Sequence, residues 1–172
     1  MTGAVARAVR FDRFGGSDVL YLADVDMPSP GSGEVVVEVR AAGVNPGEAL
    51  IRTGALHRMF PERFSATFPA GEGNDLAGVV TSVGPEVSQF SVGDEVLGFS
   101  LRRDSHATHI AVPVAQLIRK PAQLSWEIAV CSVRACGSRT IALAMWTCVD
   151  QLMSASVKRV RARWRSSAAA RW

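Results

Sequence analysis

The chain has 172 residues, of which 48% are hydrophobic and 20% are charged, with a formal net charge of +3. These values are ordinary for one globular domain, or for one domain with a tail, and they argue against a disordered or fibrous chain. No apolar run approaches the roughly 18 residues that a membrane span needs, and residues 1–10 lack the pattern of a secretory signal, so we expect a cytoplasmic protein.

The first 127 residues predict short β-strands separated by turns. Alternating or β-branched apolar residues predict strands at residues 5–11, 19–25, 34–42, 77–83, 95–99 and 109–112, with an extended segment at 117–121. Residues 48–52 predict a short helical turn, residues 53–70 a loop with or without a short helix, and Ser125 the N-cap of a helix. Many short strands with frequent Gly and Pro breaks indicate a small barrel or sandwich, and no segment has the pattern of a β–α–β unit.

The composition changes sharply near residue 128. Residues 1–127 hold 11 Lys and Arg against 15 Asp and Glu, whereas residues 128–172 hold eight against one. All three Cys lie in the last 45 residues, but only one of the 15 Gly does. We therefore divide the chain into a mainly β domain over residues 1–127 and a basic tail, irregular or partly helical and of low order, over residues 128–172.

Five motifs in the first part follow one another in a familiar order. They are Phe-Gly-Gly-Ser-Asp-Val-Leu (residues 14–20), Gly-Val-Asn-Pro (43–46), Gly-Asn-Asp-Leu-Ala-Gly (73–78), Phe-Ser-Val-Gly-Asp-Glu-Val-Leu-Gly (90–98) and Leu-Ser-Trp-Glu (124–127). Over residues 5–128 this set resembles the quinone oxidoreductases, a zinc-independent branch of the medium-chain dehydrogenase/reductase (alcohol dehydrogenase-like) family.

This resemblance implies a GroES-like, partly open β-barrel with short helices for residues 1–127. In the family a Rossmann domain follows and carries the dinucleotide, and the active site lies in the cleft between the two domains. The implied activity is the NADPH-dependent reduction of a small quinone or enone acceptor. The residues do not identify the acceptor, choose between NADPH and NADH, or indicate the oligomeric state.

The resemblance also implies a set of cleft residues, although no catalytic residue is assigned. Asn45, with Pro46 beside it, corresponds to an Asn that faces the nicotinamide. Leu50, Arg52 and Asp75 are candidates for the substrate cleft, and Leu50 stands where some relatives have an aromatic residue. Two alternatives stay open, because Gly-Val-Asn-Pro is also good turn chemistry and Arg52 is equally suited to pairing with a surface carboxylate.

The same positions argue against zinc. Zinc-dependent relatives have Cys in place of Asn45, and a His-Glu pair in place of Asn74 and Asp75, and zinc prefers nitrogen and sulfur ligands. The three Cys are odd in number and lack metal-ligand spacing. His106 and His109 are better explained as ordinary surface or strand histidines, so we expect no metal site.

The sequence offers no site for a dinucleotide. The segment Gly71-Glu72-Gly73 lacks the third glycine of G-x-G-x-x-G, since position 76 is Leu, and no other segment of the 172 residues has that motif after a strand. We therefore expect no Rossmann domain, and we expect that the chain alone does not hold NADP(H).

Three functions remain open. The chain is the catalytic domain of an oxidoreductase, a truncated remnant without turnover, or a small binding module with a basic tail. A helical stripe over residues 153–164 keeps the third open, although we expect neither nucleic acid nor a membrane as a partner. For the tail, our leading hypothesis is a frameshift near residue 128, in the gene or in its reading, that replaced the Rossmann half.

Overall fold

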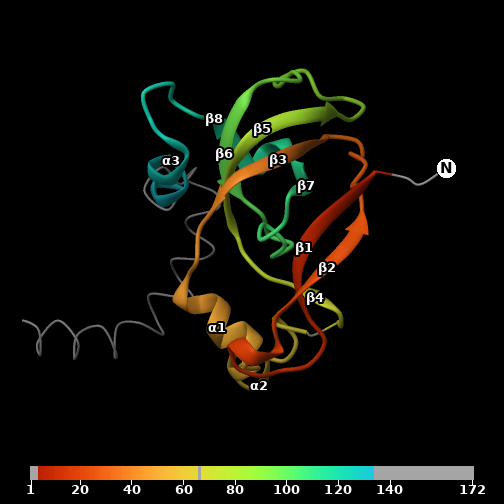
Figure 1. Ribbon diagram of the computed structural model, residues 1–172, viewed down its shortest axis with the longest axis vertical. Coiled ribbons are helices and arrows are strands. Elements are labelled where there is room, and N and C mark those ends of the chain that lie inside the picture. Colours follow the sequence, from red (N-terminus) through yellow and green to blue (C-terminus); the bar gives the residue numbers. More distant parts are fainter. Residues whose placement is uncertain (1–3, 66, 134–172) are drawn as a thin grey trace, which may run out of the picture. The chain divides into compact units, whose positions relative to one another are not determined.

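The computed structural model describes residues 4–65 and 67–133 (Figure 1). Its elements in chain order are β1 (Val5–Phe11), η1 (Ser17–Val19), β2 (Tyr21–Asp26), β3 (Glu34–Ala42), α1 (Pro46–Arg52), α2 (Ala55–Met59), β4 (Ala70–Gly71), β5 (Asp75–Val83), β6 (Glu95–Phe99), β7 (His109–Pro113), η2 (Val114–Gln116), β8 (Leu117–Arg119) and α3 (Trp126–Ser132). The predictions for the tail beyond residue 133, including its helical stripe and the frameshift, lie outside the described residues.

The strands form two sheets, one of three strands in the order β2-β1-β4 and one of five in the order β7-β3-β5-β6-β8. Every pair of neighbouring strands in the described residues is antiparallel. The five-stranded sheet curves in Figure 1 but begins at β7 and ends at β8 without closing. This mainly β, partly open architecture with short helices confirms the predicted fold, and none of the described strands forms a β–α–β unit.

The core lies on both faces of strand β3, which is paired on both sides, with β7 and with β5. Val35, Val36 and Val37 are three successive residues of this strand, and all are buried. Consecutive burial means that both faces of the strand are covered, since side chains alternate between the faces. Val35 and Val37 belong to a cluster with Leu76 and Val80 of β5, so the two neighbouring strands share one core.

Helix α3 begins where the sequence predicts it. The Ser125 hydroxyl accepts a hydrogen bond from the N–H of Ile128 at 3.4 Å, as an N-cap does. Ala129 and Val130 are buried against Ala77 and Leu97. The helix therefore crosses residue 127, and the division of the chain at that point stays a prediction.

The starts of three elements differ from the predictions. The second strand begins at Tyr21 rather than at residue 19, because Ser17–Val19 forms a 3-10 turn whose Val19 is buried. Helix α1 begins at Pro46, two residues early, because proline is well suited to the first helical position. Strand β5 begins at Asp75, which pairs with Phe99 of β6. The short helix considered for residues 53–70 is present as α2. None of the described helices is long and apolar enough to cross a bilayer.

Candidate functional site

Asn45 lies at the point where the chain leaves β3 and enters α1. It is the N-cap of α1 with extended backbone (φ −116°, ψ 142°), and Pro46 is the first helical residue. Its side-chain Nδ2 donates a hydrogen bond to Oδ2 of Asp75 at 2.9 Å. Two of the predicted cleft residues, 30 positions apart in the chain, are therefore in direct contact.

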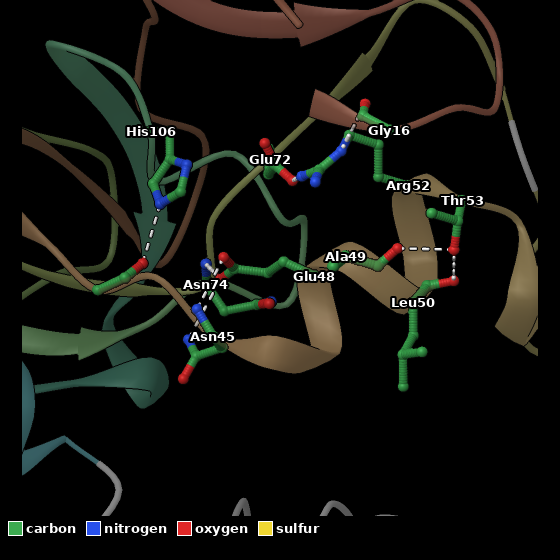
Figure 2. Close-up of polar contacts among 11 residues, drawn as sticks. Gly16, Asn45, Glu48, Ala49, Leu50, Arg52, Thr53, Glu72, Asn74 and His106 are labelled. Carbon is green, nitrogen blue, oxygen red and sulfur yellow. Dashed lines mark hydrogen bonds and ion pairs between the residues drawn. The ribbon is translucent and has the colours of Figure 1, made fainter. Parts of the chain in front are cut away.

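A buried carboxylate that is not among the predicted cleft residues, that of Glu48, bonds to Asn45. Glu48 is only 5% exposed, and its Oε2 accepts from the backbone N–H of Asn45 at 3.0 Å. Its Oε1 accepts from Asn45 Nδ2 and from the backbone N–H of Asn74, both at 3.2 Å (Figure 2). The spacing Asn-Pro-Gly-Glu is the signal that could have found it, since Glu at the third helical position returns to the N-cap in a capping box.

Asn74 connects the start of β5 to the end of β6. Its Nδ2 donates to the carbonyl of Ser100 at 2.9 Å, and its own carbonyl accepts from the N–H of Ser100 at 2.7 Å. Both residues are buried. These bonds hold Asp75, the next residue, in position toward Asn45.

The other end of α1 carries two further predicted cleft residues. The Arg52 guanidinium pairs with the carboxylate of Glu72, and its Nε donates to the carbonyl of Gly16 at 3.1 Å (Figure 2). The pairing expected as an alternative is therefore present, but its carboxylate is buried rather than on the surface, with the Glu72 side chain 6% exposed. Leu50 is 46% exposed and points away from this ion pair.

The segment between these two ends is tightly packed. Gly73 has φ +94°, and a Cβ there would lie 2.4 Å from the His106 ring and 2.5 Å from Oγ of Ser105. A Cβ on Gly71 would lie 2.5 Å from the Arg10 guanidinium. A phosphate loop needs backbone N–H groups that a pyrophosphate can approach closely, and here side chains already cover the backbone. The pyrophosphate of a dinucleotide does not fit at this segment.

His106 and the neighbouring donors do not form a metal site. Nε2 of His106 lies 2.9 Å from the carbonyl of Gly43 and donates to it, since a carbonyl only accepts. Within residues 4–65 and 67–133, no three His, Cys, Asp or Glu side chains are grouped so as to hold a metal ion. The side chains at Asn45 and Asp75 are instead bonded to each other.

A pocket of about 310 Å³ lies on the α2 side of the molecule. Its lining includes the rings of Phe11, Phe14 and Phe68, which meet edge to face, together with His57. Asn45 and Asp75 are not among the lining residues. The candidate site at the start of α1 is therefore separate from this pocket.

Comparison with known families places most of the described chain in one of them. Residues 31–122 match the family described as "Alcohol dehydrogenase GroES-like domain". The quinone oxidoreductase of Mus musculus is 44% identical over 95 residues, which are 55% of this chain and 27% of that protein. The quinone oxidoreductase of Homo sapiens is 34% identical over 122 residues, which are 70% of this chain and 35% of that protein. The chain thus spans about a third of the length of these curated relatives.

Solved structures agree with this comparison. The quinone oxidoreductase from Coxiella burnetii superposes with a TM-score of 0.67 at 27% identity, over 74% of this chain and 40% of that one. The Escherichia coli quinone oxidoreductase complexed with NADPH also gives a TM-score of 0.67, at 26% identity, over 74% of this chain and 37% of that one. The two sheets and short helices described above are therefore a fold that quinone oxidoreductases share.

Proposed function

Because the chain belongs to the alcohol dehydrogenase family with a GroES-like domain, in its quinone oxidoreductase branch, we propose that residues 1–133 form the substrate side of an NAD(P)H-dependent oxidoreductase. The acceptor class is a quinone or an enone. One observation carries the proposal: the Asn45 amide is held between two carboxylates, from α1 and β5, at the position where the family resemblance implies the nicotinamide.

The chemistry of this amide suits the nicotinamide end of the cofactor. A primary amide both donates and accepts hydrogen bonds, and so does the carboxamide of nicotinamide. Bound NADPH would supply the hydride, which with a proton from solvent reduces a quinone to a hydroquinone. In this reading Asn45 and Pro46 orient the ring, while Leu50 and Asp75 line the acceptor side and Arg52 holds α1 against Glu72.

The described residues offer nothing comparable for the other end of the cofactor. The Gly71–Gly73 segment is packed by Arg10, Ser105 and His106, and pyrophosphate binding in this family comes from the Rossmann domain. We therefore propose that this chain alone does not bind NADPH. A cytoplasmic location, and the absence of nucleic-acid and membrane partners, also remain predictions.

The decisive test joins residues 1–133 to the Rossmann domain of a quinone oxidoreductase. We expect the fusion to oxidise NADPH in the presence of p-benzoquinone, at a rate well above that of the Rossmann domain alone. A fusion that folds, by its circular dichroism and cooperative melting, but shows no turnover would favour the truncated remnant instead.

Two titrations of the full chain separate the remaining alternatives. Saturable NADPH binding at micromolar concentration would overturn the proposal that the chain alone lacks a nucleotide site. The binding module rests on the charge of the tail, eight Lys and Arg against one acidic residue. DNA binding that weakens steeply with salt, and that disappears when residues 150–172 are deleted, would favour it.

A further inference from the structure

The pocket of about 310 Å³ beside α2 takes no part in the contacts around Asn45. Its volume is at the lower end of the range of about 300–1,000 Å³ that is typical of small-molecule sites. Its lining comes from four separate parts of the chain: the end of β1 and the turn after it, the helices α1 and α2, the segments 64–65 and 67–71, and the turn at residues 102–103. The pocket is therefore a product of the fold rather than of one loop.

Four phenylalanines and one histidine line the pocket, and contacts among them fix their rings. The ring centroid of Phe14 lies 5.2 Å from that of His57 and 5.3 Å from that of Phe68, and a Cβ on Gly54 would lie 2.8 Å from the Phe14 ring. Nδ1 of His57 lies 2.9 Å from the carbonyl of Phe64 and donates to it, since a carbonyl only accepts. Phe68 is still 38% exposed, so a ligand that covers it would bury apolar surface that now faces water.

The charged residues of the lining are both cationic. Arg102 and Arg103 belong to it, and no Asp or Glu does. Arg102 is paired with Glu34 at 2.5 Å, whereas Arg103 has no ion pair within residues 4–65 and 67–133. The carboxylate next to it in the chain, that of Asp104, accepts from the hydroxyl of Ser100 at 2.5 Å. The pocket thus has positive charge that the described residues leave without a paired carboxylate.

A second such cation lies at the same end of the pocket. A Cβ on Gly71, which is one of the lining residues, would lie 2.5 Å from Nη1 of Arg10 and 2.7 Å from the carbonyl oxygen of Arg103. Arg10 likewise has no ion pair in the described part of the chain, and the nearby carboxylate of Glu72 is paired with Arg52. Two arginines without carboxylate partners therefore meet at Gly71, beside the aromatic rings.

We propose that this pocket is a binding site for a small aromatic acid, whose ring packs among the phenylalanines and whose carboxylate pairs with Arg103, with Arg10 close by. Aromatic rings attract one another in edge-to-face and offset arrangements, and a guanidinium holds a carboxylate through strong, charge-assisted hydrogen bonds. The rings select the aromatic part of the ligand, and the arginines select its charge. Because Asn45 and Asp75 do not line this pocket, the inference does not depend on the proposed oxidoreductase activity.

The probe is 2-naphthoate, titrated into the full chain by isothermal titration calorimetry. We expect one saturable site with a Kd between about 10 µM and 1 mM, as the affinity per atom of small ligands implies. The amide 2-naphthamide, which has the same rings but no charge, should bind about tenfold more weakly or worse. Octanoate, which has the charge but no ring, should bind at least about threefold more weakly.

Two pairs of variants place the binding in the pocket. Arg103→Gln should lower the affinity for 2-naphthoate about tenfold, whereas Arg63→Gln, at an exposed residue outside the lining, should change it by less than about twofold. Phe68→Leu should weaken 2-naphthoate and 2-naphthamide alike, by about threefold, whereas Phe60→Leu, at a ring that is also exposed but lies outside the lining, should weaken neither.

Three results would overturn the proposal: no saturation below about 10 mM, an affinity for 2-naphthamide or octanoate equal to that for 2-naphthoate, or equal losses in Arg103→Gln and Arg63→Gln. The last would mean that the probe responds only to the positive charge of the chain. If Arg103→Gln does not melt cooperatively, Arg10→Gln takes its place. A loss of about fivefold in that variant would support the site, and an unchanged affinity would contradict it.

Discussion

The two ends of α1 are each held by a buried carboxylate, but the two carboxylates meet different partners. At the N-terminal end Glu48 accepts from neutral N–H groups of Asn45 and Asn74. At the C-terminal end Glu72 pairs with the cation of Arg52. The first arrangement orients an amide at the start of the helix, and the second neutralises charge inside the fold. Burial alone therefore does not distinguish a binding site from a structural support, whereas the chemistry of the carboxylate's partner does.

A single segment serves both ends. Glu72 bonds to Arg52, and two residues later the N–H of Asn74 bonds to Glu48. Gly73, between them, has a positive φ, and its Cα packs so closely against the His106 ring that a Cβ would not fit. Changes at either end or at this glycine therefore probe one structural unit.

The largest effect is expected from Arg52→Ala. It removes the cation from a carboxylate that is 6% exposed, and it also removes the hydrogen bond to the Gly16 carbonyl. Losing one partner of a buried pair costs about 3–5 kcal/mol, which urea unfolding followed by circular dichroism would measure. Arg13→Ala, at an exposed pair with Asp12, should change the free energy of unfolding by less than about 1 kcal/mol. Similar losses in the two variants would mean that the inner pair is not a support.

Gly73→Ala should have the next largest effect. The new methyl group would meet the His106 ring and Oγ of Ser105 at 2.4–2.5 Å, on backbone with φ +94°. Overpacking and backbone strain together predict a loss of about 2–4 kcal/mol in the free energy of unfolding.

Gly33 provides the matched control for that change. It also has a positive φ, +70°, but a Cβ there would meet nothing within 4 Å. Gly33→Ala should therefore lose only the strain, about 1 kcal/mol. Equal melting temperatures for the two variants would show that the backbone around Gly73 can shift to accommodate a methyl group.

A smaller effect is expected at the N-terminal end. Asn45→Ala removes one donor from Glu48 and one from Asp75, but the backbone N–H groups of Asn45 and Asn74 remain on Glu48. We expect a loss of about 1–2 kcal/mol in the free energy of unfolding. A loss as large as that of Arg52→Ala, measured in the same urea titration, would mean that the two ends of α1 contribute equally to stability.

The smallest effect concerns an exposed ion pair and sharpens the contrast with the buried one. Hydrogen bonds from Arg119 and from the N–H of Ser91 hold the pKa of Asp94 below its ordinary value of 3.8. A carboxyl group with a lowered pKa stabilises the fold above its unfolded pKa, and this contribution disappears as the pH falls through the folded value. The wild type should therefore melt slightly higher than Asp94→Asn at neutral pH. The difference should vanish as the pH falls well below 3.8; a gap that persists in acid would assign it to another cause.

Much of the fold is predictable from local signals. The valine-rich segment at residues 34–42 is β3, and Ser125 caps α3 as expected. The start of β5 is not, because Asp75 and Leu76 join the strand by pairing with β6, which alternation along one segment does not reveal. The 3-10 turn before β2 is missed for a similar reason, since it depends on burying Val19.

The candidate site is predictable only in part. Asn45 is found through a motif, and its contact with Asp75 is a tertiary result. The contact of Glu48 with the N–H of Asn45 is predictable from the sequence, because the capping-box spacing is local. The pairing of Arg52 with Glu72, 20 residues apart, depends on how the Gly71–Gly73 segment folds back against α1, and residue types alone do not show this.

The central claim is that the N-terminal end of α1 presents Asn45 to the nicotinamide. The most direct test is kcat/KM for NADPH in the fusion of residues 1–133 to a Rossmann domain, compared between wild type, Asn45→Ala and, as a control at a partly exposed pair with Arg40 on β3, Glu38→Gln. We expect Asn45→Ala to lower kcat/KM by about tenfold or more, equivalent to about 1.4 kcal/mol of transition-state stabilisation, and Glu38→Gln to leave it unchanged. An Asn45→Ala fusion that is folded and as active as the wild type would contradict the claim.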